Sequence, residues 1–588
     1  MKLFDGTRSG RILNHKMFVF WRRMFPSWTG LPIALLALPV LALAQLKPAS
    51  ATESLTDVSP YAYPAALLEQ AAELRERAIN DSDPFAIVAS LSSEIGPRLA
   101  GSDGDRAAVA WALNFLQDLK LDRIAAQGVL VPRWERGEIR VRILSPSTQN
   151  LTAVALGGSV GTAEGGLEAP VLRVPDLDTL REMSTDQVAG HVVFIDQSIE
   201  RSKDASGYSN ALANRSDGAS VAARLGAVGL AIRSLGTDSN RLPHTGRVVY
   251  ADRVARIPAV ALSAPDADIL ARQFDDDGAV ILQLMLSSRS LGTARSANVI
   301  GEIRGQTQPD EIVLLGAHLD AWDLGTGALD NGTGVAIVTE TMRLIAMMPT
   351  RPARTVRVVL FADEELSLSG AKAYAARNTG ATEVHVLGME PDGGSGRVWR
   401  LDGVVPQSAA PLLSGMAGVL KPLDIPLGVI RSKGGGEDLA FLRQRGMPEI
   451  TPRQDYTYYF DYHHSANDTL DKVDPAALRQ VVAAYAAITW LAANTEASFG
   501  RLPVASPGAP PPKPAVNPQP EARQIDQRLD QQVEQAEQAE QLEQQQAQGA
   551  PQLIEPEEAQ QTEDPVDPPD AAGPADSVDS ESNGRGTD

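Results

Sequence analysis

Cysteine is absent from this sequence of 588 residues. The chain therefore cannot form a disulfide, bind a metal through a thiolate or use a thiol as a nucleophile. Histidine is also scarce, with seven residues in the whole chain. Any metal ion must be bound by histidine nitrogens and by the carboxylates of aspartate and glutamate.

The apolar run at 31–44, LPIALLALPVLALA, falls short of the about 20 residues that a membrane-spanning helix needs. Arg22 and Arg23 precede it, and Ala42-Leu43-Ala44 has the small-residue spacing of a cleavage site. These features predict a signal peptide at 1–44 and a secreted or periplasmic protein. Membrane attachment is expected only if this segment stays uncleaved.

Basic charge is in deficit, and the formal net charge is −21. Much of it is local, because residues 507–588 hold 18 acidic and 4 basic residues. No segment is basic enough to bind nucleic acid. Since the end of the chain is rich in Pro, Gln and Glu and nearly free of aromatic residues, we predict a disordered acidic tail at 505–588.

The chain between these ends has normal apolar content and changes character along its length. We predict four segments, which are a spacer with a first helix (45–84), the helical start of a catalytic domain (85–130), a smaller strand-rich module (131–295) and a segment of alternating strands and helices (296–498). The last pattern is typical of an α/β fold in which helices wrap a parallel sheet.

Histidine or carboxylate residues follow three predicted strands of the last segment. The strand IVLLGA precedes His318, VRVVLFA precedes Asp363, Glu364 and Glu365, and VHVLGM precedes Glu390 and Asp392. The stretch YHHSANDT adds His463 and His464. Because ligands gather at the carboxyl ends of strands in open α/β sheets, these side chains are expected to meet in one crevice.

Two interpretations compete for this pattern. A single acid after a strand is usually a helix cap or a solvated loop residue, and the Gly-rich stretch at 316–334 also suits a surface loop. A metal site explains why several strand ends carry such residues together. Two metal ions require a shared ligand, and a carboxylate with two oxygens can bridge them. The adjacent Glu364 and Glu365 can divide the tasks of general base and ligand.

The motifs HLDAWDLGTGALDNGTG, ADEEL, MEPDGG and HHSANDT resemble the di-zinc exopeptidases related to bacterial leucyl aminopeptidases, glutamate carboxypeptidase II and the transferrin receptor. The resemblance covers roughly residues 85–495. It implies a zinc-exopeptidase fold with a mostly parallel sheet wrapped by helices, and a β-rich protease-associated domain inserted at 131–295. It also implies two zinc ions, a peptide substrate and a homodimer.

By motif position, the resemblance also implies the roles of seven residues. Five are metal ligands, namely His318 and Asp392 for one zinc, Glu365 and His464 for the other, and Asp330 as the bridge. Glu364 is implied as the general base, and Asp320 as the group that holds the second ring nitrogen of His318.

The sequence departs from the family pattern at two positions. Asn331 follows the bridging Asp330 where a second aspartate is common. Asp363 replaces a small residue before the glutamate pair, and it raises the pKa of the general base if its carboxylate points inward. All five ligand positions are retained, which argues against a catalytically inactive family member.

Other residues receive weaker interpretations. His463 is expected to pack or to contact substrate rather than to bind metal, because successive side chains point apart in extended backbone. His244 is expected to be structural. The Gly-rich stretch 434–438 lacks a phosphate-loop pattern and is expected to line the substrate pocket. The tyrosines of the stretch 456–459 are expected in that pocket or in a dimer contact.

The leading hypothesis is therefore an exported di-zinc exopeptidase that hydrolyses dipeptides or short peptides with a glutamate general base. Whether it acts as an aminopeptidase, a carboxypeptidase or a dipeptidase stays open. The alternative is a non-catalytic binding protein on the same fold, whose acidic tail recruits a partner.

Overall fold

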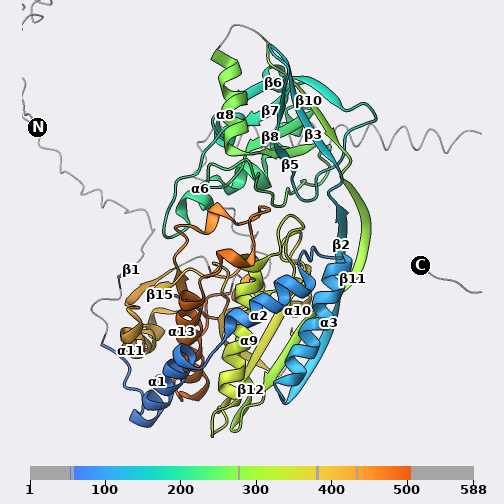
Figure 1. Cartoon of the computed structure of the whole chain (residues 1–588). Helices are drawn as coiled ribbons and strands as arrows, with labels where there is room; N and C mark the ends of the chain where they lie inside the picture. The colour runs from blue at the N-terminus through green and yellow to red at the C-terminus, as the bar shows by residue number, and fades with distance from the viewer. Residues whose placement is uncertain (1–52, 55–58, 276–278, 379–382, 432–434, 505–588) are drawn as a thin grey trace, which may run out of the picture. The chain divides into compact units, whose positions relative to one another are not determined.

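The computed structural model describes residues 53–54, 59–275, 279–378, 383–431 and 435–504. The predicted signal peptide and the predicted acidic tail lie outside these residues. Two β-sheets with their helices make up the described part of the chain (Figure 1).

The larger sheet has nine described strands. In spatial order they are β1 (Glu53–Ser54), β16 (Leu427–Ile430), β15 (Val398–Val404), β17 (Glu449–Gln454), β14 (Val384–Met389), β12 (Gln308–His318), β13 (Arg354–Phe361), β11 (Arg289–Ile303) and β2 (Arg123–Glu135). The central strands β17, β14, β12 and β13 are parallel, whereas β2, β11 and β15 pair antiparallel with their inner neighbours. The fold is thus mixed α/β, with fewer parallel pairs than the sequence predicted.

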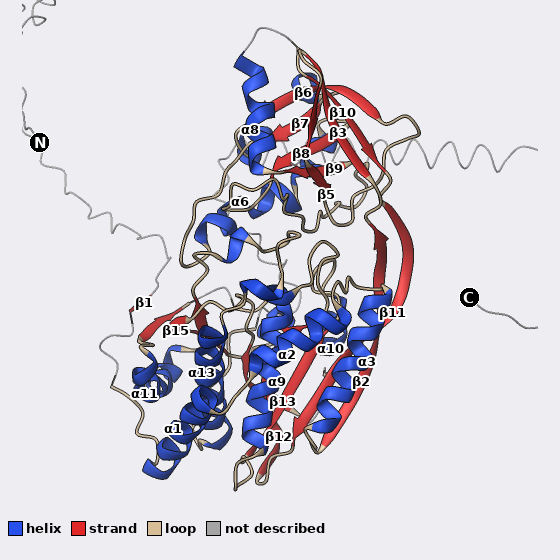
Figure 2. Ribbon diagram, viewed as in Figure 1, coloured by secondary structure: helices blue, strands red, loops and turns tan. Residues whose placement is uncertain are grey.

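Helices cover both faces of this sheet (Figure 2). Their bounds are α1 (Ala65–Asn80), α2 (Pro84–Ser90), α3 (Asp103–Asp118), α9 (Thr333–Ala346), α10 (Ser369–Arg377), α11 (Ala410–Leu420), α12 (Ala440–Arg443) and α13 (Pro475–Asn494). Alternate residues of β12 enter different cores, because successive strand side chains point to opposite faces. Val313 and Leu315 pack with α9 and α13, while Ile312 and Leu314 pack with α10 and α12.

Helix α13 is the one described helix that is long and apolar enough to cross a membrane by length and composition. Its apolar window is 89% buried inside the protein. It packs extensively against α1 and α9. These contacts are those of a core helix.

The sequence analysis was wrong about residues 123–130, which it expected to be helical. They form the first part of β2, which pairs with β11 along almost its whole length. The partner strand lies more than 150 residues later in the sequence. When the partner of a strand is so distant in the sequence, the residues of the strand themselves give little indication that they form one. Pairing in the folded protein then overrides the helix propensity of these residues.

The chain between β2 and β11, residues 136–288, forms the second sheet and is called the insert below. Its eight strands are, in spatial order, β4 (Gln149–Leu151), β3 (Ile139–Ser145), β10 (Ile281–Leu286), β6 (Leu167–Val174), β7 (Val192–Ile195), β8 (Gly229–Arg233), β9 (Ala259–Leu262) and β5 (Ala153–Ala155). The insert also contains α4 (Leu177–Arg181), α5 (Thr185–Val188), α6 (Ser206–Ser216), α7 (Gly218–Arg224) and α8 (Ala264–Arg272). Strands β2 and β11 connect it to the larger sheet (Figure 1).

Candidate active site

The parallel strands β12, β13 and β14 bring three functional segments to one edge of the larger sheet. His318 is the last residue of β12 and is in register with Phe361 of β13. Glu365 follows β13, and Asp392 follows β14. Asp330 lies in the turn before α9, and His464 lies in the loop after β17. The five predicted ligands therefore come from five separate segments.

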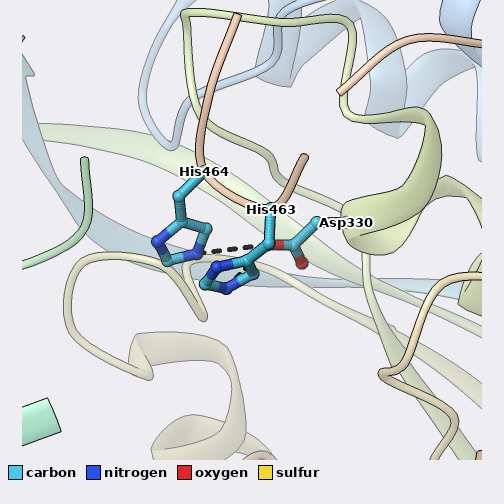
Figure 3. Close-up of side chains that lie close together, drawn as sticks. All are labelled: Asp330, His463 and His464. Atoms are coloured by element: carbon cyan, nitrogen blue, oxygen red, sulfur yellow. Dashed lines mark ion pairs between the residues drawn. The ribbon is translucent and has the colours of Figure 1, made fainter. Parts of the chain in front are cut away.

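Asp330 lies between the two predicted histidine ligands, and Figure 3 shows it beside one of them, His464. Its Oδ1 is 3.1 Å from Nε2 of His318, and its Oδ2 is 3.1 Å from Nε2 of His464. Nε2 of His318 is also 3.6 Å from Oδ1 of Asp392. Nε2 of His464 is 3.0 Å from Oε2 of Glu365. The structure thus brings all five together as two groups that share one carboxylate.

Several atoms of this cluster are buried without a hydrogen-bond partner among the described residues. They are Nε2 of His318, Oδ2 of Asp330, Oε1 of Glu365 and Oδ1 of Asp392. Unpaired buried polar atoms are costly, and a bound cation removes that cost for all of them at once. Imidazole and carboxylate donors are ligands that zinc accepts, so the residues present fit this metal.

His463 lies closer to the site than the sequence analysis expected. Its ring stacks on that of His464, with centroids 3.5 Å apart, and its Nε2 is 3.5 Å from Oδ2 of Asp330 (Figure 3). The rings do not point apart because the backbone here is not extended, and His464 has a φ of 61°. Burial lowers the pKa of His463, and His464 lowers it further. His463 therefore offers a neutral ring beside Asp330.

The ring nitrogens that face away from Asp330 are held by backbone carbonyls. Nδ1 of His318 donates to the carbonyl of Asp320 over 3.0 Å. Nδ1 of His464 lies 3.3 Å from the carbonyl of Thr245. A hydrogen on Nδ1 leaves Nε2 free to bind a metal.

Asp320 contacts the second ring nitrogen of His318 through its backbone carbonyl. Its carboxylate lies 3.8 Å from the same nitrogen, within ion-pair distance but without a hydrogen bond. It instead accepts the backbone N–H groups of Glu364, over 3.0 Å, and of Glu365, over 3.3 Å. Burial raises the pKa of Asp320 to about 7. The residue orients a histidine with its carbonyl and the glutamate pair with its side chain.

Glu364 lies beside the ligands without forming a short contact to either histidine. Burial raises the pKa of its carboxyl well above the usual range, with His318 opposing and Glu365 reinforcing this change. Asp363 is buried, and its Oδ2 accepts from the Ser367 hydroxyl and from the backbone N–H of Ser369, which supports the turn before α10. Its Oδ1 has no hydrogen-bond partner among the described residues, and its charge contributes to the raised pKa of Asp320.

Two residues for which the sequence analysis gave no role support the loops that carry the predicted ligands. The Asp468 carboxylate accepts the backbone N–H groups of Leu329, over 2.6 Å, and of Asp330, over 3.1 Å. Arg98 is fully buried and donates to the carbonyls of residues 319, 326 and 327 over 2.6–2.8 Å. Asp468 lies inside the motif HHSANDT, and Arg98 lies in the stretch EIGPRLAGS at 94–102, so their neighbourhood in the sequence was the available signal.

Substituting Arg98 by Met is expected to lower the free energy of unfolding by at least about 3 kcal/mol, because three buried carbonyls lose their donor at about 1–3 kcal/mol each. Chemical denaturation of the zinc-loaded protein measures this. Arg106→Met, at an exposed position on α3, is the control and is expected to change stability by less than about 0.5 kcal/mol. Equal stability of the two variants would contradict the structural role of Arg98.

The insert contributes directly to the site. His244 is buried, lies 2.8 Å from Oδ1 of Asp238 and donates through Nδ1 to the carbonyl of His463 over 2.6 Å. The N–H of Thr245 donates to the carbonyl of His464 over 2.8 Å. These contacts give His244 the structural role that was expected, since it positions the histidine pair.

The tyrosines near the site have different surroundings. The Tyr456 hydroxyl donates to the backbone carbonyl of Asp392 over 2.9 Å. The Tyr459 ring lies 5.0 Å from that of His463, whereas Tyr458 is 66% exposed. From the Gly-rich stretch, the Asp438 side chain is buried, and neither of its oxygens has a hydrogen-bond partner among the described residues.

Several known proteins are similar to this chain in sequence. The model of peptidase family M28 matches residues 298–489. Carboxypeptidase Q of Mus musculus is 32% identical over 411 residues, which cover 70% of this chain and 86% of that protein. Aminopeptidase YwaD of Bacillus subtilis is 24% identical over 339 residues, covering 57% of this chain and 66% of that protein.

Two solved structures of peptidases have a fold similar to that of this chain. A peptidase M28 precursor from Shewanella amazonensis SB2B is 44% identical, with a TM-score of 0.72, and the match covers 75% of this chain and 99% of that one. BSAP, a zinc aminopeptidase from Bacillus subtilis, shares the fold at 20% identity and a TM-score of 0.51, over 71% of this chain and 96% of its own.

The α/β fold, the paired histidine and carboxylate groups and these relatives together define a zinc metallopeptidase of the exopeptidase type. The chain belongs to peptidase family M28. It is similar to carboxypeptidase Q along most of its described length.

Proposed function

We propose that this metallo-exopeptidase binds two zinc ions and hydrolyses dipeptides or short peptides. The observation that carries the proposal is the arrangement of Asp330, whose two oxygens each face a different histidine at 3.1 Å. A shared carboxylate of this kind is what a pair of metal ions requires. His318 and Asp392 complete one group, and Glu365 and His464 complete the other.

The contacts indicate which groups would activate the substrate and which residue would transfer the proton. When bound, the two zinc ions polarise the scissile carbonyl and lower the pKa of the attacking water. Glu364, which is outside the ligand set, accepts a proton from that water and delivers it to the leaving amine. Burial raises the pKa of Glu364 from its usual range, which moves it toward the value that suits a group that both accepts and donates a proton. Asp320 keeps Glu364 and Glu365 in place through their backbone N–H groups.

The wider organisation is part of the same proposal. The insert is a protease-associated domain, predicted at 131–295, and the catalytic domain comprises 85–130 together with 296–498. Residues 45–84 precede the catalytic domain. The partners of the protein are a peptide substrate and a second copy of the chain. The protein is secreted or periplasmic, with the signal peptide at 1–44.

The non-catalytic alternative was favoured only by the acidic tail and is not retained, because the relatives are peptidases.

Removal of zinc by 1,10-phenanthroline is expected to abolish dipeptide hydrolysis, and two equivalents of zinc per chain are expected to restore it. The physical reason is that four of the predicted ligands each have a buried atom with no hydrogen-bond partner among the described residues, which a metal ion would satisfy. The control is 1,7-phenanthroline, an isomer that cannot chelate and is expected to leave the rate unchanged. Full activity at a zinc content below one ion per chain would refute the two-metal proposal.

A further inference from the structure

Exposed basic residues gather on α10, just after α12 and near the end of the described chain. They are called the basic face below and are Lys372, Arg377, Arg445 and Arg501. Contacts with the backbone hold these segments together. Arg445 donates to the carbonyl of Ala375 in the last turn of α10, and Arg501 donates to the carbonyl of Arg445 over 2.7 Å. The cations therefore lie close together on one part of the surface.

The basic face lacks acidic partners. Among the described residues, none of its four cations forms an ion pair. Lys372 donates to the carbonyl of Ser367 over 2.6 Å, and Arg501 donates to two backbone carbonyls. The next acidic residue along the chain after α10, Glu383, is already paired with the buried Arg357 over 2.8 Å. Charges of one sign so close together repel, and a bound anion removes that repulsion.

The acidic end of the chain begins beside this surface. The N–H of Leu502 donates to the carbonyl of Gly446, the residue after Arg445, over 2.9 Å. The described chain ends two residues later. Residues 507–588 hold 18 acidic and 4 basic residues, and the stretch 555–581 contains ten acidic residues and no basic one. The segment that is complementary in charge to the basic face is thus joined to it covalently.

The chain between the basic face and this stretch is long enough to fold back. Residues 505–554 number 50. For the disordered chain that the sequence predicts, their average end-to-end distance is about 40 Å. Such a linker keeps the acidic stretch near the basic face, so binding is intramolecular and needs little intrinsic affinity.

We propose that the acidic segment 555–581 binds the basic face of its own chain through charge pairing. Three of the four cations are arginines, whose planar guanidinium groups can donate two parallel hydrogen bonds to one carboxylate. The binding depends on salt, because exposed charges are screened over about 10 Å at an ionic strength of about 0.1 M. The inference goes beyond the proposed function and does not depend on it.

The test treats the full-length, zinc-loaded protein with a water-soluble carbodiimide, which joins a lysine amine to an adjacent carboxylate as an amide. Peptide mass spectrometry is expected to find Lys372 joined to acids of 555–581 in about 10 mM salt, with at least about fivefold less product in about 1 M salt. Lys120 and Lys421, which are exposed elsewhere, are the reference amines. Each is expected to give at least about fivefold less of the product than Lys372 in low salt.

The matched variants reverse one arginine charge each. Arg377 is exposed and has no hydrogen bond or ion pair among the described residues, so Arg377→Glu is expected to fold normally. The product yield at Lys372 is expected to fall about three- to tenfold in this variant, because one attractive charge becomes repulsive. Arg224→Glu makes the same change in the last turn of α7 in the insert and is expected to leave the yield unchanged.

Equal yields at the three lysines would overturn the proposal, as would a yield at Lys372 that high salt leaves unchanged. Equal effects of the two variants would also contradict it. Cross-links found mainly between isotope-labelled and unlabelled chains in a mixed preparation would show that the occupant is the tail of a second copy, which overturns the intramolecular form.

Discussion

Glu364→Gln is expected to keep two zinc ions per chain and to hydrolyse peptides about 100 to 10,000 times more slowly than the unaltered protein. Glutamine has nearly the same volume as glutamate but cannot accept a proton from water. The five predicted ligands are unchanged in this variant. The backbone N–H of residue 364 still donates to Asp320, so the neighbouring Glu365 keeps its position.

Steady-state kinetics and zinc analysis on the same preparation measure both parts of this prediction. The loss is expected in kcat rather than in KM, because the general base acts in the transition state. Glu69→Gln, an exposed position on α1, makes the same chemical change away from the site and is expected to have no effect. A Glu364→Gln protein with normal kcat would show that another group acts as the base.

The second large effect is expected for Asp330→Asn, which should bind no more than one zinc ion per chain. The amide keeps the shape of the side chain and one oxygen, but its nitrogen cannot act as a ligand. The group of either His318 or His464 then loses its shared donor. Because metal ions contribute several kcal/mol of charge stabilisation, kcat/KM is expected to fall by more than about 1,000-fold.

Metal analysis after dialysis against zinc, combined with activity measurements, checks this result. The informative control is Asp468→Asn, which leaves all ligands in place and weakens only the support of the Asp330 backbone. Its loss is expected to be smaller, about 10- to 100-fold, as for other groups that orient a ligand. Two tightly bound zinc ions in Asp330→Asn would exclude a bridging role for Asp330.

Pattern-based prediction worked where the evidence is local. Each of β12, β13 and β14 contains an apolar run with a donor residue at its end or within four residues after it, and the parallel register carries those residues to one edge. The same reasoning failed for β2, whose partner β11 lies far along the chain. Parallel pairing was overestimated partly for the same reason, since the antiparallel strands β2 and β11 are the segments through which the chain enters and leaves the insert.

The predicted ligand set followed from the restriction of the residue types. With no cysteine and seven histidines, few combinations can hold a metal, and the resemblance carried the roles over by motif. For Asp320, the resemblance implied a contact with the second ring nitrogen of His318, and the structure places the Asp320 carbonyl there. Its position two residues after His318 indicated a contact, but whether the carbonyl or the carboxylate makes that contact depends on the backbone path.

The sequence alone determined the donor types, the order of the strands that carry them and the family, because these are properties of neighbouring residues. Only the tertiary structure decided which distant groups support them. Arg98 and Asp468 hold the ligand loops through hydrogen bonds to backbone groups, and the motifs that contain these two residues do not show which loops they contact. Arg247 meets Glu364 only because the insert folds back on the catalytic edge, across 117 positions of sequence. Contacts between residues so far apart in the sequence depend on how the two sheets pack. That packing depends on side chains from many segments, so no single stretch of sequence predicts it.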